Sequence, residues 1–186
     1  MAFLSSEGLS PARRIGSATA AIVLVLLIGY FFGIRGMRFF MVPTSSMEPT
    51  LLRRDHIVSM TEKNHQRGDV VVHRDPTEAG AYLVKRIVGL PGDVLSIEGG
   101  ALFINGSYAS EPYILEPMQI TLDPPVQVPE DQVWVLGDNR NASEDSINWG
   151  HGIWMDDVIG KVHYIYRPLS RIGSVPSYPL RNIEGD

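Results

Sequence analysis

The longest apolar stretch of the chain runs from Ile15 to Ile34, where 20 consecutive residues carry no charge. As an α-helix with a rise of about 1.5 Å per residue, it is about 30 Å long and matches the hydrocarbon core of a bilayer. A cleaved secretory signal is the alternative, but its apolar region usually has ~7–15 residues and ends at small side chains, where this chain has Tyr30, Phe31 and Phe32. The pattern therefore predicts a retained transmembrane helix over residues 15–34, preceded by a tail of residues 1–14.

The charges beside this stretch do not give its orientation. Arg13 and Arg14 precede it, and Arg35 and Arg38 follow it, so both flanks carry two basic residues. The positive-inside rule needs an excess of basic residues on one flank, so it predicts neither orientation here.

After residue 34 the pattern changes to short runs of Val, Ile, Tyr and Phe separated by Gly, Pro and Asp, which is typical of β-strands and turns. No stretch keeps a helical period for long, although residues 154–159 fit one helical turn. The Pro-rich segment Glu111–Pro129 is interpreted as connecting chain, and residues 169–186 as a flexible tail that frays from about Ser170. The predicted strands are His56–Met60, Asp69–His73, Tyr82–Leu90, Val94–Ile97, Ala101–Ile104, Gln132–Leu136 and Lys161–Tyr166.

Composition excludes several classes of function. With 16 Lys and Arg against 21 Asp and Glu, the formal net charge is −5, which argues against nucleic acid as the main partner, because phosphate binding relies on clustered cations. The absence of cysteine excludes disulfides, thiolate metal sites and a cysteine nucleophile. The five histidines have no metal-binding spacing and are interpreted as surface side chains that are exposed or hydrogen-bonded.

The most informative cation is Lys85, in the middle of the predicted strand Tyr82–Leu90. Residues two apart share a face of a strand, so Lys85 lies beside Leu83 and Ile87, and Arg86 lies on the other apolar face. In one interpretation both aliphatic stems lie along the sheet and both charged heads reach water. In the other, burial lowers the pKa of Lys85, and the neutral amine serves as a general base.

A general base needs a weak nucleophile, and hydroxyl residues lie between Pro43 and Pro49 in the segment Pro-Thr-Ser-Ser-Met-Glu-Pro. The two prolines restrict the backbone and would hold a serine in one place. An ordinary turn is the alternative interpretation of this segment taken by itself.

Together these segments resemble a known family. Pro43–Thr50, Lys85–Asp93 and Gly137–Ser146 are similar, in this order, to the signature segments of type I signal peptidases, which also have an N-terminal membrane anchor. The similarity covers Phe39 to Arg167. It implies a serine endopeptidase that uses a serine/lysine dyad to remove signal peptides from exported preproteins.

The resemblance also implies residue roles. Ser46 matches the nucleophile and Lys85 the general base. Thr44 matches a hydroxyl residue that stabilises the oxyanion together with the Ser46 backbone N–H. Ser143 matches a hydroxyl that orients the lysine amine, and Asp145 an acidic residue that supports the site from behind. Positions that line the pockets for small substrate side chains are matched by Phe40, Val42, Leu51 and Val84.

One position departs from the family pattern. Many members carry a basic residue after the Asp-Ser of the last segment, but here Ile147 follows Ser146. Asp145 is therefore expected to lack its usual ion-pair partner, with Arg140 as a candidate replacement.

The implied fold is mainly β: a transmembrane helix, then an antiparallel, barrel-like catalytic domain over residues 35–168 with a short β excursion over 94–129. The resemblance places this domain on the extracytoplasmic face of the membrane and residues 1–14 in the cytoplasm. It implies signal peptides and the lipid bilayer as partners, and neither a metal nor another cofactor. Two alternatives stay open: a maturation peptidase with a narrow substrate set, such as conjugation or pilus proteins, and a β module that binds peptides without cutting them.

Overall fold

The computed structural model describes residues 11–34, 36–178 and 180, and its contacts divide the chain into two units, Met1–Met37 and Arg38–Asp186. In the first unit, α1 (Pro11–Gly29) continues into a π-helical segment, η1 (Tyr30–Ile34). No helix among the described residues is both long enough and apolar enough to cross a membrane. The transmembrane helix over 15–34 stays a prediction, and residues 1–10 of the predicted tail lie outside the described residues.

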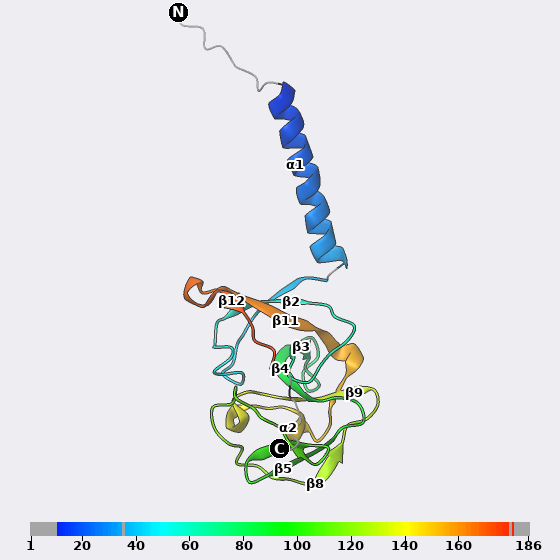
Figure 1. Cartoon of the computed structure of the whole chain (residues 1–186), viewed down its shortest axis with the longest axis vertical. Coiled ribbons are helices and arrows are strands. Elements are labelled where there is room, and N and C mark those ends of the chain that lie inside the picture. Colours follow the sequence, from blue (N-terminus) through cyan, green and yellow to red (C-terminus); the bar gives the residue numbers. More distant parts are fainter. Residues whose placement is uncertain (1–10, 35, 179, 181–186) are drawn as a thin grey trace, which may run out of the picture. The chain divides into compact units, whose positions relative to one another are not determined.

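The second unit is built around a large antiparallel sheet (Figure 1). Its pairing order is β1-β2-β11-β3-β4-β9-β10, with β12 paired to β11. Because β1 and β10 end this order, the described strands form an open sheet by hydrogen bonding. The predicted antiparallel, mainly β architecture is confirmed. The strands are β1 (Arg38–Met41), β2 (His56–Met60), β3 (Val70–Arg74), β4 (Tyr82–Gly89), β9 (Gln132–Leu136), β10 (Ile153–Trp154), β11 (Val158–Arg167) and β12 (Gly173–Ser174).

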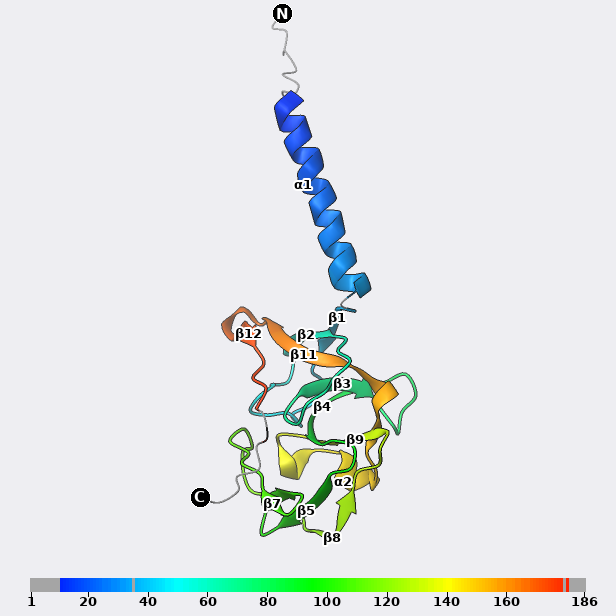
Figure 2. The same cartoon turned by 45° about the vertical axis from the view of Figure 1, so that its right-hand side comes forward.

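A smaller antiparallel sheet has the order β7-β6-β5-β8 and lies at the end of the unit away from β2, β11 and β12 (Figures 1 and 2). It is made of β5 (Val94–Glu98), β6 (Ala101–Ile104), β7 (Ser107–Tyr108) and β8 (Leu122–Gln127). The short helices are η2 (Arg140–Ala142), α2 (Ser146–Trp149), η3 (Met155–Asp157) and η4 (Leu169–Arg171).

The alternation of side chains along β3 explains why the large sheet is buried on both faces. Val70 and Val72 belong to one apolar cluster, and Val71 between them belongs to another. The first cluster also contains Met47 and Leu51 of the segment after β1, so this segment is packed against the sheet. A third cluster joins β4 and β9 to the smaller sheet.

All seven strands predicted from the sequence are confirmed, with bounds that differ by a few residues. The interpretation of Glu111–Pro129 as connecting chain alone is wrong, because β8 forms within it and pairs with β5. The helical turn expected over 154–159 is limited to η3, and β11 begins directly after it.

The expectation that the chain frays from about Ser170 is corrected for the described residues. η4 is followed by β12, which pairs with β11, and the Val175 side chain is buried in the core. Fraying was expected from Pro, Ser and Gly content, but the hydrogen bonds of β11 and the apolar cluster outweigh this local preference. Residues 179 and 181–186 of the predicted tail lie outside the described residues.

Candidate active site

The serine segment is fixed to the sheet by its buried neighbours. After β1, the backbone of Val42 pairs with Arg54 and Asp55, and the backbone N–H of Leu51 donates to the Met47 carbonyl at 2.9 Å. Met47 and Leu51 are fully buried, so the intervening turn cannot shift without exposing apolar surface. Ser46, directly before Met47, is thereby held in one position and is 8% exposed.

Lys85 lies in the middle of β4 and is 2% exposed. Its Nζ donates a hydrogen bond to Ser143 Oγ at 2.9 Å. Burial lowers the pKa of Lys85 to about 8, although nearby carboxylates, led by Asp145 and Glu144, partly oppose this shift by favouring the charged amine. The interpretation in which the charged heads of Lys85 and Arg86 both reach water is wrong, because both side chains are buried.

Ser46 and Lys85 come together although they are 39 positions apart in the sequence. Both line one pocket of about 260 Å³, together with Thr44. The Thr44 and Ser46 hydroxyl oxygens are 3.1 Å apart, and either can donate. The predicted nucleophile, base and oxyanion hydroxyl therefore face the same space.

The third signature segment lies against the first. The backbone N–H of Asn139 donates to the Ser46 carbonyl at 3.0 Å, and its side-chain Nδ2 donates to the Ser45 carbonyl at 3.3 Å. A Cβ at Gly137 would overlap both the Ser46 carbonyl and the Ser143 side chain. Glycine at this position therefore allows the closest approach of the two segments.

Asp145 supports the site through backbone groups. Its Oδ2 accepts from the Gly137 N–H at 3.0 Å, and its Oδ1 accepts from the Ile147 N–H at 3.3 Å at the start of α2. The suggestion that Arg140 replaces the missing ion-pair partner of Asp145 is wrong. Arg140 instead forms a buried ion pair with Glu111.

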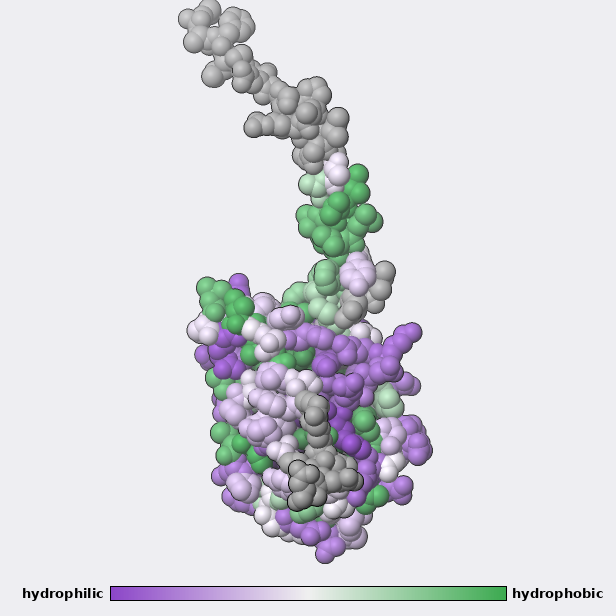
Figure 3. Space-filling view, viewed as in Figure 1, coloured by the Kyte–Doolittle hydropathy of each residue, from purple (hydrophilic) through white to green (hydrophobic). Residues whose placement is uncertain are grey.

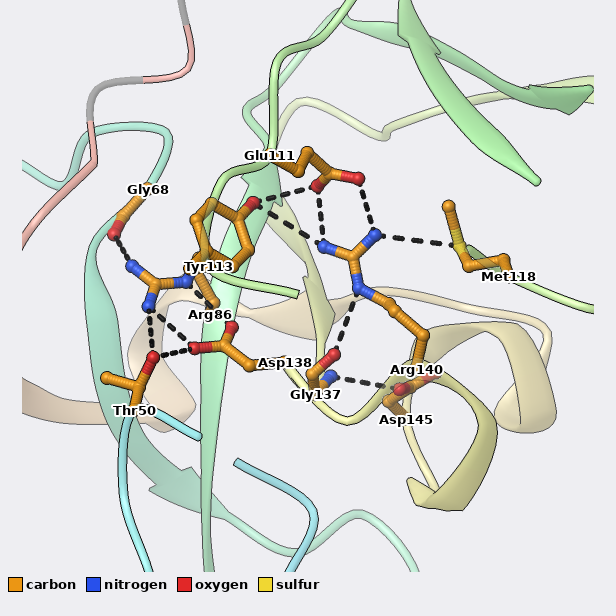
Figure 4. Close-up of polar contacts among 10 residues, drawn as sticks. All are labelled: Thr50, Gly68, Arg86, Glu111, Tyr113, Met118, Gly137, Asp138, Arg140 and Asp145. Atoms are coloured by element: carbon orange, nitrogen blue, oxygen red, sulfur yellow. Dashed lines mark hydrogen bonds and ion pairs between the residues drawn. The ribbon is translucent and has the colours of Figure 1, made fainter. Parts of the chain in front are cut away.

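A buried ion pair connects all three signature segments (Figure 4). Arg86, next to Lys85 on β4, donates to both carboxylate oxygens of Asp138 at 2.8 and 2.7 Å, and both side chains are completely buried. Thr50, after the serine turn, donates to the same carboxylate at 2.5 Å. Arg86 also donates to the Gly68 carbonyl at 2.6 Å, so its charge is compensated and its donors are used.

The second buried arginine joins the site to the chain between β7 and β8 (Figure 4). Arg140 Nε donates to the Gly137 carbonyl at 3.0 Å, while its two terminal nitrogens donate to Glu111 at 2.6 and 2.5 Å. The Tyr113 hydroxyl donates to the same carboxylate at 2.7 Å, and the Tyr113 ring lies 4.0 Å from the Arg86 guanidinium carbon. These contacts fix the backbone around Gly137.

The four predicted substrate-pocket residues occupy three different environments. Val42 and Val84 line a second small pocket beside Ser46, with a volume of about 10 Å³. Phe40 is half-buried and its ring lies 5.5 Å from that of Tyr82. Leu51 is fully buried in the apolar cluster that also contains Met47, and Leu51 itself lines neither pocket.

Several residues around the larger pocket were not predicted from the sequence. Asp75, Thr77, Glu144 and Trp149 line it together with Ser46 and Lys85. Asp75 accepts from the backbone and side chain of Thr77, which is the turn signal that Asp-x-Thr gives, but nothing in the sequence places this turn near Lys85.

His73 is a further correction, because it is fully buried rather than at the surface. Its ring lies 6.0 Å from the Trp149 ring, and burial lowers its pKa to about 4. Within the described residues, no group of three or more His, Asp or Glu side chains is placed to hold a metal ion.

A serine hydroxyl and a buried lysine amine that line one pocket of a β domain are the parts of a serine/lysine hydrolase. Comparison with known proteins gives the family. The model of the family "Signal peptidase, peptidase S26" matches residues 14–167. The chain belongs to this signal peptidase family.

Individual relatives match along most of the chain. The probable signal peptidase I-1 of Synechocystis sp. is 36% identical, covering 88% of this chain and 87% of the relative. The signal peptidase I of Leptolyngbya laminosa is 34% identical over 88% of this chain and 85% of the relative, and the signal peptidase I P of Bacillus subtilis subsp. natto is 35% identical over 82% and 86%. A crystal structure of a signal peptidase I from Enterococcus faecalis matches 54% of this chain and 98% of that chain, with 29% identity and a TM-score of 0.49.

Proposed function

We propose that this protein is a serine endopeptidase that removes signal peptides from exported preproteins, with Ser46 as the nucleophile and Lys85 as the general base. The observation that carries this proposal is the buried Lys85 amine, oriented by Ser143, in the pocket that Ser46 also lines. Membership of the signal peptidase family supports the same activity.

The route of the proton depends on the pKa of Lys85, which burial lowers to about 8. A neutral amine has a lone pair, so Lys85 accepts the Ser46 hydroxyl proton while Ser46 Oγ attacks the scissile carbonyl. The resulting ammonium group gives this proton to the leaving amine of the mature protein. Lys85, neutral again, then activates a water molecule that hydrolyses the acyl-enzyme. Ser143 keeps the amine directed into the pocket through its 2.9 Å hydrogen bond.

The Thr44 hydroxyl and the Ser46 backbone N–H are the proposed oxyanion donors. The Thr44 hydroxyl lies 3.1 Å from Ser46 Oγ, so it is close to the carbonyl that Oγ attacks. Removing one such donor typically lowers the rate by ~10²–10³. Asp145 acts behind the site, where it holds the Gly137 backbone N–H.

The substrate is proposed to bind in an extended conformation beside β4. β9 pairs with β4 only from Arg86 onward, whereas Tyr82 to Lys85 pair with β3 on the other side. The strand edge next to Ser46 can therefore hydrogen-bond to a peptide backbone. The pocket lined by Val42 and Val84 suits a small substrate side chain, with Phe40 farther along β1; Leu51 would shape this pocket only from beneath.

The N-terminal helical segment is proposed to anchor the protein in a membrane as a single span. α1 continues directly into η1, and the large apolar side chains from Ile22 to Phe32 are all exposed, at 37–66%. Such side chains are stable in lipid, where a signal peptide also lies, and sharing one membrane raises the effective concentration of the substrate. The catalytic unit is proposed to lie on the extracytoplasmic face and residues 1–14 in the cytoplasm. Neither step of the chemistry needs a cofactor.

One experiment distinguishes a general signal peptidase from the two alternatives, a maturation peptidase with a narrow substrate set and a module that binds peptides without cutting them. The full chain is co-expressed with an exported precursor, and the N-terminus of the product is sequenced. Cleavage after the signal peptide is expected, and Ser46→Ala and Lys85→Met should each abolish it while far-UV circular dichroism stays unchanged. A Lys63→Met variant, which changes an exposed lysine in a loop, is the matched control and should cleave normally.

Full cleavage by either dyad variant would overturn the proposed chemistry. Cleavage of unrelated preproteins separates a general signal peptidase from a maturation enzyme with a narrow substrate set. The relatives named signal peptidase I do not favour this alternative or a non-cutting peptide-binding module.

A further inference from the structure

A separate pocket of the Arg38–Asp186 unit lies away from Ser46 and Lys85. It measures about 430 Å³ and is lined by the turn before β2 and by the chain where β11 ends. Four of its lining residues are arginines, Arg53, Arg54, Arg167 and Arg171, and it has no lining residue in common with the pockets that contain Ser46.

The charge of this arginine pocket is not balanced by its own carboxylate. Asp55 is the acidic residue that lines it, and Asp55 is already bound by Arg171 Nε at 3.0 and 3.1 Å and by the Leu52 backbone N–H at 2.9 Å. Arg53 Nε donates to the Pro43 carbonyl at 3.2 Å, which orients the side chain but does not neutralise it. Four guanidinium groups and one carboxylate line the pocket, so three positive charges are left without a negative charge among the lining residues.

Exposed apolar side chains lie directly beside these charges. Leu169 and Ile172, on either side of Arg171, are 83% and 59% exposed. Figure 3 shows strongly hydrophobic residues gathered at the end of the unit where β11 and β12 meet, next to strongly hydrophilic ones. A further exposed apolar side chain, Met41 on β1, lies near the pocket in the strand register. Met41 pairs with His56, and His56 pairs with Arg167 on β11.

This combination identifies the chemistry of a ligand. A guanidinium group binds phosphate oxygens with two parallel hydrogen bonds, and it is less strongly hydrated than an ammonium group. Leu169 and Ile172 gain free energy only if an apolar phase covers them. A ligand that brings a phosphate and an apolar phase together is an anionic phospholipid at a membrane surface.

We propose that the arginine pocket binds the phosphate group of an anionic glycerophospholipid, with Leu169 and Ile172 inserted among the acyl chains. The proposal rests on the membrane location proposed above. Only residues 35–37 separate η1 from β1, so the chain itself limits how far β1 can lie from the anchor. Binding of a headgroup would hold the catalytic unit at the lipid surface by a second contact.

The test uses the full chain in a non-ionic detergent and native mass spectrometry with dioleoyl phosphatidylglycerol or dioleoyl phosphatidylcholine. The pocket variant is Arg54→Gln with Arg167→Gln, which keeps a polar, hydrogen-bonding side chain at both positions and removes two charges. The matched control is Lys63→Gln with Arg74→Gln, which removes two charges at exposed positions outside the pocket. With about 1 kcal/mol per basic residue near a lipid surface, phosphatidylglycerol retention should fall roughly 10- to 30-fold in the pocket variant alone.

Three results would overturn this proposal. These are equal phosphatidylglycerol retention by the pocket variant and the wild type, equal retention of the two lipids by the wild type, and displacement of phosphatidylglycerol by inorganic phosphate at the same concentration. The last result would assign the pocket to a soluble anion. Cleavage of a detergent-soluble signal peptide should stay at the wild-type level in the pocket variant. Because lipid retention by Ser46→Ala does not depend on cleavage, failure of the proposed function and failure of the lipid site are distinguishable.

Discussion

At the scale of single residues, the protonation state of Lys85 links burial to chemistry. Its amine has one described hydrogen-bond partner, Ser143, and lies in a largely dehydrated environment, so the neutral form is favoured. The neighbouring Arg86 is also buried, but its guanidinium group is paired with the Asp138 carboxylate. Two adjacent basic residues on one strand therefore differ in their partners. Lys85 faces a hydroxyl group, and Arg86 faces a carboxylate.

The first residue-scale prediction concerns the pH dependence of cleavage. Lys85 must be neutral to accept a proton, so kcat/KM should rise with pH to a plateau, with a midpoint near the pKa of about 8. At pH 6 the rate should be about a hundredfold below the plateau. In a Glu144→Gln variant the midpoint should shift to lower pH, because the Glu144 carboxylate raises the pKa of Lys85. A midpoint near that of free lysine would contradict the proposed role.

The second concerns stability. The pKa of Lys85 is about 8 in the folded protein, below the ordinary lysine value of 10.5, so the unfolded chain binds the proton more tightly. The free energy of unfolding of the wild type should therefore rise between about pH 8 and pH 10.5. Lys85→Met lacks this rise and should be the more stable protein below pH 8, by an amount on the order of 3 kcal/mol that shrinks toward pH 10.5.

Denaturant titrations of both proteins in the same detergent across this pH range measure this difference. Lys63→Met, an exposed lysine, should follow the wild-type curve. A difference in the free energy of unfolding that stays the same at all pH values would show that burial does not lower the pKa of Lys85.

At the scale of elements, the site depends on two turns that approach within backbone contact. The serine turn after β1 and the loop after β9 meet where Asn139 donates to the Ser46 carbonyl. Asp145 holds this loop from behind by accepting from the Gly137 N–H and by capping α2. Ile147 causes no loss of this support, since its backbone N–H donates to Asp145.

We expect Gly137→Ala to separate these two turns. The added methyl group would overlap the Ser46 carbonyl and the Ser143 side chain, and neither backbone can move without breaking its hydrogen bonds. Overpacking of this kind typically costs ~1–3 kcal/mol, and a displacement of about 1 Å at a catalytic group can cost ~10² in rate. Both kcat and the melting temperature should fall.

A Ser143→Ala variant is the comparison for this change. It removes the hydrogen bond to Lys85 without adding atoms, so kcat should fall while the melting temperature changes little. Wild-type activity in Gly137→Ala would show that the close approach is not needed.

At the scale of the whole molecule, the Arg140–Glu111 pair joins the active-site loop to the region of the smaller sheet. Glu111 and Tyr113 lie in the chain between β7 and β8, whereas Arg140 lies in η2 after β9. Through Tyr113, the same segment also contacts the guanidinium of Arg86. The small β excursion is therefore part of the support of the site.

Glu111→Gln should destabilise the protein by about 3–5 kcal/mol, because it leaves the buried Arg140 charge without its carboxylate. The double variant Glu111→Leu with Arg140→Met removes both charges and should recover most of this loss. Thermal unfolding monitors stability, and kcat monitors the loop around Gly137. If Glu111→Gln were as stable as the wild type, the pair would not connect the two regions.

The sequence by itself determined the β class, seven of the strands and the family, because alternating apolar runs, turn residues and three ordered motifs are local properties of the chain. It also named the dyad residues and Ser143 through the resemblance. It did not determine β8, β12 or the buried state of His73, which depend on pairing partners and packing far away in the chain.

Only the tertiary structure decided which charges are compensated. Arg140 lies five positions before Asp145, yet it pairs with Glu111, 29 positions away, because folding brings that carboxylate into the same buried space. The sequence left open whether Lys85 reaches water, since the exposure of a strand residue depends on what the rest of the chain places over it. Local motifs thus determine which reactive groups the site contains. Long-range packing determines where these groups lie and in which protonation state.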